Sequence, residues 1–135
     1  MSGEHTGSCL CGEVRFEILG AFDGFFLCHC SRCRKGSGSA HGANLFSTTA
    51  TLNWLSGEDM VKTFDVEGTR HRRSFCNTCG SPLPRFHKNG WLVAPAGGFD
   101  SAIEKRPDAH IFTGSRANWD HLLEDVPAFE EFPGQ

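Results

Sequence analysis

The segment Cys76-Asn-Thr-Cys79-Gly80 joins two thiols by a short turn, and Cys9-Leu-Cys11-Gly12 does the same with one residue between them. Cysteines at such spacing can turn back on one metal ion, and the glycine that follows relieves crowding in the turn. Together the two segments supply four sulfurs, which close the tetrahedron of a structural zinc site. Because the segments lie more than sixty residues apart, such a site would clamp the fold.

The remaining three cysteines lie in Cys28-His-Cys30-Ser-Arg-Cys33. Three protein ligands leave a fourth position for water or substrate, which is typical of a catalytic zinc. We therefore expect the seven thiols to divide into four and three, with two zinc ions per chain. His29, His41 or a carboxylate is an alternative fourth ligand, and iron is an alternative to zinc.

The cysteine count also bears on location. Seven thiols cannot all pair within the chain, and residues 1–7 have neither the basic start nor the apolar stretch of a signal peptide. No apolar run approaches the length of about 18 residues that a membrane-spanning helix needs. These features predict a reducing compartment, the cytoplasm, where clustered thiols indicate metal binding or redox chemistry.

The composition predicts one soluble globular domain spanning residues 1–135. Apolar residues make up 39% and charged residues 21% of the chain, and the formal net charge is -3. Two zinc ions held by seven thiolates would move this charge to about -6. A surface that binds nucleic acid normally needs a positive excess, so we expect neither a nucleic-acid nor a membrane partner.

The hydrophobic pattern predicts a mainly β protein. Residues 13–18 alternate polar and apolar, with Val14, Phe16 and Ile18 on one face, as in a half-buried strand. Further strands are expected at 24–28, 41–46, 51–55, 60–66, 70–75, 82–87, 91–95 and 109–112. Their spacing suits a sandwich or open barrel. Short helical turns are expected at 30–35 and near 100–104.

The C-terminal segment differs from the rest of the chain. From Asp120 to Gln135 it has five acidic residues, no Lys or Arg, and apolar residues that include Phe129 and Phe132. We expect an extended segment that its apolar residues pin to the body. An acidic interaction tail is the alternative.

Two groups of basic residues lie near the cysteines. Arg34 and Lys35 directly follow Cys33, where they could attract an anionic substrate and lower the pKa of an incoming thiol. They are the candidate substrate-binding residues. Arg70, Arg72 and Arg73 run up to Cys76 and are expected to be solvated charges.

With three cysteine groups in this order, the sequence resembles a known family, the glutathione-dependent formaldehyde-activating enzymes, which include the centromere protein V-like proteins. The quoted segments span nearly the whole chain: Gly7-Ser-Cys-Leu-Cys-Gly-Glu-Val-Arg-Phe16, Cys28-His-Cys-Ser-Arg-Cys-Arg-Lys35, Ser37-Gly-Ser-Ala40, Trp54-Leu-Ser-Gly57, Arg73-Ser-Phe-Cys-Asn-Thr-Cys-Gly-Ser81, His110-Ile-Phe112, Ser115-Arg116, Trp119-Asp120 and Asp125-Val-Pro127.

The resemblance implies a mainly β, Mss4-like or β-tent zinc-binding fold. It implies a structural zinc on Cys9, Cys11, Cys76 and Cys79, and a labile catalytic zinc on Cys28, Cys30 and Cys33. The implied activity is that of a carbon–sulfur lyase that joins the glutathione thiol to formaldehyde as S-hydroxymethylglutathione. The alternatives are a non-enzymatic zinc module for a protein or nucleic-acid partner, and a zinc-storage or thiol-sensing protein. For the enzyme, His29 and His41 are candidates for proton transfer.

Overall fold

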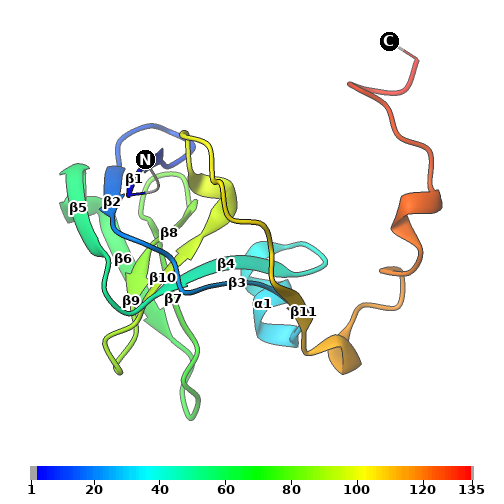
Figure 1. The fold of residues 1–135 in the computed structure, drawn as a ribbon, viewed down its shortest axis with the longest axis horizontal. Coiled ribbons are helices and arrows are strands. Elements are labelled where there is room, and N and C mark those ends of the chain that lie inside the picture. The colour runs from blue at the N-terminus through cyan, green and yellow to red at the C-terminus, as the bar shows by residue number, and fades with distance from the viewer. Residues whose placement is uncertain (1–2, 135) are drawn as a thin grey trace.

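The computed structural model describes residues 3–134, which form three β-sheets and one short α-helix (Figure 1). The first sheet has the order β1-β2-β5, with strands β1 (Glu4–Ser8), β2 (Arg15–Leu19) and β5 (Thr51–Ser56). The second has the order β11-β3-β4-β10-β9, with strands β11 (Ala109–Ile111), β3 (Gly24–Cys28), β4 (Gly42–Ser47), β10 (Leu92–Pro95) and β9 (Arg85–Phe86). The third has the order β6-β7-β8, with strands β6 (Val61–Asp65), β7 (Arg72–Cys76) and β8 (Pro82–Leu83).

Strand pairing is antiparallel except between β11 and β3. The helix α1 (Ser31–Ser37) directly follows β3, and short 3-10 turns span Glu58–Met60, Ala96–Gly98, Thr113–Ser115 and Leu123–Asp125. None of the helices in residues 3–134 combines the length and the hydrophobicity that a membrane span requires.

The core forms where the predicted apolar faces meet. Val14, Phe16 and Ile18 are fully buried, as their alternation predicts. The Phe16 ring packs edge-on against Phe99, with centroids 5.5 Å apart, and against Trp54 at 6.1 Å. Edge-on contacts of this kind are a geometry that aromatic rings prefer.

The mainly β prediction is confirmed, with differences in three places. Strand β1 was not expected, because its sequence, Glu-His-Thr-Gly-Ser, lacks the apolar alternation of a strand and pairs with β2 through its backbone. The expected helical turn near 100–104 is absent, because the N–H groups of Asp100 and Ser101 both donate to the Thr6 carbonyl and hold this segment against β1.

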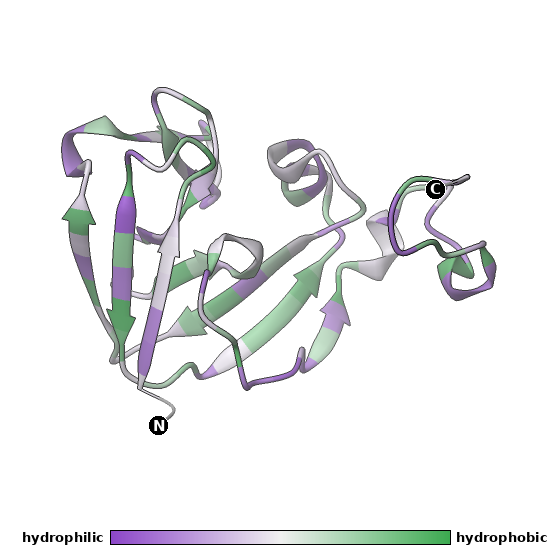
Figure 2. Ribbon diagram, turned by 90° about the horizontal axis from the view of Figure 1, so that it is seen from above, coloured by the Kyte–Doolittle hydropathy of each residue, from purple (hydrophilic) through white to green (hydrophobic). Residues whose placement is uncertain are grey.

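The third difference is the C-terminal arm, defined here as residues 117–134. In both ribbon views it projects from the body beyond β11 (Figures 1 and 2). Every residue from 121 to 134 is exposed. The expectation that apolar residues pin this segment to the body is therefore wrong. Its backbone hydrogen bonds are local turns, such as Asp125 N–H to the Leu122 carbonyl, and these do not anchor it to a sheet.

Candidate metal centres

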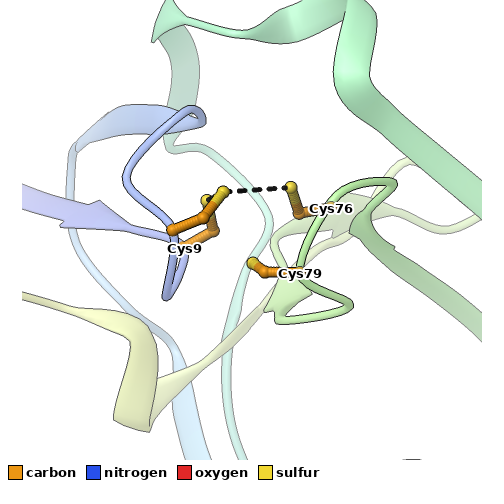
Figure 3. A group of neighbouring side chains, drawn as sticks. Cys9, Cys76 and Cys79 are labelled. Atoms are coloured by element: carbon orange, nitrogen blue, oxygen red, sulfur yellow. Dashed lines mark hydrogen bonds between the residues drawn. The ribbon is translucent and has the colours of Figure 1, made fainter.

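Four sulfurs meet between the first and third sheets (Figure 3). The Sγ atoms of Cys9, Cys11, Cys76 and Cys79 all lie within 4.8 Å of one another. Cys9 and Cys11 Sγ are 3.5 Å apart, and Cys11 and Cys76 Sγ are 3.9 Å apart. A zinc–sulfur distance of about 2.3 Å gives a tetrahedron with edges of about 3.8 Å, so this donor set fits zinc.

Each half of the four-sulfur set is a tight turn closed by a glycine. The Gly12 N–H donates to the Cys9 carbonyl at 3.0 Å, and the Gly80 N–H donates to the Cys76 carbonyl at 2.8 Å. Both glycines have positive φ angles, 82° and 77°. Side chains disfavour that conformation, so the glycines are required for the turns that direct the sulfurs inward.

The sulfurs also shift one another's protonation. Hydrogen bonding from Ser81 lowers the pKa of Cys79 to about 5. The Glu13 N–H favours the Cys11 thiolate, but desolvation and the neighbouring sulfurs raise the pKa of Cys11 to about 12. Four thiolates this close repel one another, and a divalent cation between them removes that repulsion.

Ser81 is a supporting residue to which the sequence assigned no role. Its hydroxyl accepts the Leu10 N–H at 2.8 Å and lies 3.3 Å from Cys79 Sγ. It therefore links the two turns. The only sequence signal was its place directly after Cys79-Gly80.

The other three sulfurs form a separate set where β3 passes into α1. The Sγ atoms of Cys28, Cys30 and Cys33 lie within 4.8 Å of one another. Cys30 caps the helix, and its sulfur accepts the Cys33 N–H at 3.4 Å. Burial raises the pKa of Cys33, as do the charges of Cys28 and Cys30. The structure thus groups the thiols as four and three.

His29 lies within the three-cysteine loop, but its ring nitrogens face other partners. Its Nε2 is 2.8 Å from His110 Nδ1, and its Nδ1 is 3.0 Å from the Asp120 carboxylate, which also pairs with Arg116. The side chain is 1% exposed, and burial lowers its pKa. His41 stacks edge-on against it at 5.1 Å. His29 therefore ties the loop to β11 and the base of the arm.

A cavity of about 80 Å³ opens beside Cys33. The lining includes Asn44 of β4, His71, Arg73 of β7 and Arg85 of β9. The Arg85 Nε donates to His87 Nε2 at 3.2 Å, and burial lowers the pKa of Arg85 to about 10 although Cys33 opposes the shift. Among the described residues, no carboxylate forms an ion pair with Arg85.

Arg73 is not the solvated charge that the sequence predicted. Its Nε donates to the Gly36 carbonyl at 3.1 Å and its Nη2 donates to the Gly80 carbonyl at 3.2 Å. It therefore joins α1 to the turn that carries Cys79. Arg34 and Lys35 lie on α1, outside the residues that line the cavity.

Comparison with known proteins shows the family to which the chain belongs. Residues 4–115 match the family described as "Glutathione-dependent formaldehyde-activating enzyme". A Halomonas elongata protein named "Putative glutathione-dependent formaldehyde-activating enzyme" is 32% identical over 127 residues, which cover 84% of this chain and 77% of that protein. A crystal structure of a Rhodobacter sphaeroides protein superimposes with a TM-score of 0.54 and 21% identity over 76% of this chain and 97% of that chain.

The last of these likenesses concerns the fold alone. Fold and site together define a small, mainly β protein with two thiol clusters able to hold metal ions. The chain belongs to the glutathione-dependent formaldehyde-activating enzyme family, and the resemblance seen in the sequence is confirmed.

Proposed function

We propose that the protein is a zinc-dependent carbon–sulfur lyase that forms or breaks a thiol–aldehyde adduct such as S-hydroxymethylglutathione. Family membership supports the reaction class. The observation that carries the proposal is the three-sulfur set beside a cavity in which Arg85 has no carboxylate partner among residues 3–134. A thiol substrate with a carboxylate would supply that partner, as glutathione does.

The two sulfur sets take different roles in this proposal. Cys9, Cys11, Cys76 and Cys79 hold a structural zinc that joins two sheets. Cys28, Cys30 and Cys33 hold a labile zinc, which when bound would stabilise a substrate thiolate and lower the pKa of its thiol. Because all seven thiols must stay reduced, we place the protein in the cytoplasm.

The remaining roles belong to positively charged side chains. Arg85 orients an anionic group of the substrate inside the cavity, and Arg73 fixes the position of α1. Arg34 and Lys35 raise the local concentration of anionic thiols near the helix. In the synthetic direction the thiol sulfur bonds to the aldehyde carbon, and the thiol proton passes to the aldehyde oxygen. No electron donor or acceptor is needed.

The test is calorimetric titration of the zinc-loaded protein with glutathione, beside S-methylglutathione, which lacks the thiol. We expect glutathione to bind more tightly, and Arg85→Gln to weaken binding about tenfold or more, as loss of a charge-assisted hydrogen bond would. Arg15→Gln is the matched control, because Arg15 is exposed on β2. Adduct formation from glutathione and formaldehyde is followed by NMR in the same samples.

Two results of these titrations would contradict the proposal. If no low-molecular-weight thiol binds, while a protein or nucleic acid binds tightly, the chain is a non-enzymatic zinc module. If glutathione and S-methylglutathione bind alike, the three-sulfur set takes no part in recognition.

A further inference from the structure

The C-terminal arm exposes several large apolar side chains. The exposed fractions are 57% for Trp119, 56% for Leu122, 55% for Val126, 60% for Phe129 and 75% for Phe132. Large apolar side chains exposed together on one short segment indicate an interaction site. Figure 2 shows these hydrophobic stretches on a segment that stands apart from the sheets.

The base of the arm is fixed, whereas residues 121–134 form no ion pair with the body and are exposed. Asp120 pairs with His29 and Arg116. Past Asp120, the hydrogen bonds of the described residues are local turns. The arm therefore leaves the body in a set direction, from the end that holds α1 and β11 and away from β5 and β6 (Figure 1).

The body carries a cleft suited to such a segment. About 300 Å³ in volume, it lies between β5 and the β6–β7 pair, with apolar lining from Leu52, Trp54, Val61 and Phe86. Phe86 is 43% exposed there. A second hollow of about 390 Å³ adjoins it, because Arg72 lines both.

The arm and these two hollows are complementary in charge as well as in polarity. The second hollow is lined by three basic residues, Arg70, Arg72 and Lys88, and by one carboxylate, Asp65, which pairs with Arg72. The arm holds five of the chain's sixteen acidic residues and none of its thirteen Lys and Arg. Its segment Phe129-Glu-Glu-Phe132 places two carboxylates between two aromatic rings. The rings match the apolar cleft, and the carboxylates match the basic hollow.

We propose that the arm docks in this cleft on a second copy of the chain, giving a twofold dimer with reciprocally exchanged arms. Two copies offer two arms and two clefts, so a twofold arrangement fills both and closes. Three aromatic side chains on each arm would bury about 900–1,500 Å² across the two arms, before the matching cleft surfaces are counted. A stable interface buries about 1,200–2,000 Å² in total. The dimer does not depend on the chemistry of the three-sulfur set.

The experiment is sedimentation velocity on the full-length, zinc-loaded protein at micromolar concentrations. We expect the wild type to sediment as a dimer and the arm variant Phe129→Ser/Phe132→Ser as a monomer. Phe64→Ser is the matched control, because Phe64 is 60% exposed on β6 but lies outside the cleft lining. It should remain dimeric. Circular dichroism and zinc content check that each variant is folded.

A mixing experiment then distinguishes an arm that docks on a second copy of the chain from an arm that folds back onto the cleft of its own chain. The cleft variant Phe86→Ser has an intact arm, and the arm variant has an intact cleft. Each should be monomeric alone, and an equimolar mixture should form a heterodimer through one arm–cleft pair, more weakly than the wild type. A monomeric wild type, an arm variant that stays dimeric, or a mixture that does not associate would each overturn the proposal.

Discussion

The Ser81 hydroxyl illustrates how one residue sets the acid stability of the four-sulfur set. It keeps the pKa of Cys79 near 5, below the ordinary value of 9.0. A lower pKa means that protons compete less with a metal ion for the Cys79 thiolate at any given pH. In the metal-free protein, the same depressed pKa contributes stability that is complete above pH 9.0 and disappears as the pH falls towards 5.

Ser81→Ala should consequently release the tightly held zinc at a higher pH. Without the hydroxyl, the pKa of Cys79 rises, and the midpoint of zinc release should move up by about one pH unit. A zinc-sensitive dye added during a pH titration measures the midpoint. Ser101→Ala removes a hydroxyl that accepts the Thr6 N–H and has no hydrogen bond to a cysteine among the described residues, so it should leave the midpoint unchanged.

Single ligands in the two sets should have unequal effects on folding. Cys79→Ser weakens a zinc that joins distant segments, and structural zinc supplies about 10–16 kcal/mol in small peptides. Total domain stability is only about 5–15 kcal/mol, so we expect insoluble or unfolded protein. Cys30→Ser should stay soluble and β-rich, with about one zinc and no activity. If the two variants unfold alike in circular dichroism, the three-sulfur set is structural too.

At the scale of elements, Arg73 connects β7 to α1 through its hydrogen bond to the Gly36 carbonyl. Arg73→Met removes two hydrogen bonds from a charged donor, worth about 1.5–3 kcal/mol each. We expect a lower denaturation midpoint and weaker retention of the zinc on the three-sulfur set. Arg15→Met is the control, because Arg15 is exposed on β2 and forms no ion pair among the described residues, so its loss should matter little. Equal losses in the two variants would contradict the bridging role.

The elements also show what could be predicted from the sequence. Strand β3 forms at 24–28 as expected, and β2 buries the predicted face, because both have strong local patterns. The division of the thiols follows from local spacing and coordination number. The partners of Arg73 and Arg85 could not be predicted, since they come from distant segments. The prediction that the C-terminal segment packs on the body was wrong, because the hydrophobic content of a segment does not say which surface covers it.

For the whole molecule, metal content is the decisive measurement. Freshly purified protein should approach two zinc ions per chain, and a mild chelator should remove one and leave the other. The four-sulfur set has all four ligands from the protein, whereas the three-sulfur set leaves one position to exchangeable molecules. Elemental analysis with thiol counting gives the stoichiometry. One metal at full occupancy with three free thiols would contradict the two-site arrangement.

The parallel pairing of β11 with β3 has a consequence for biosynthesis. The His29 N–H donates to the Ile111 carbonyl. The loop that carries three thiols can therefore form this contact only after β11, more than eighty residues later in the chain, has been synthesised. The four-sulfur set is complete once residue 79 has left the ribosome. Since contacts distant in sequence form late, we expect the nascent chain to load its metals in sequence. Thiol labelling of stalled chains of increasing length should find Cys79 protected before Cys33.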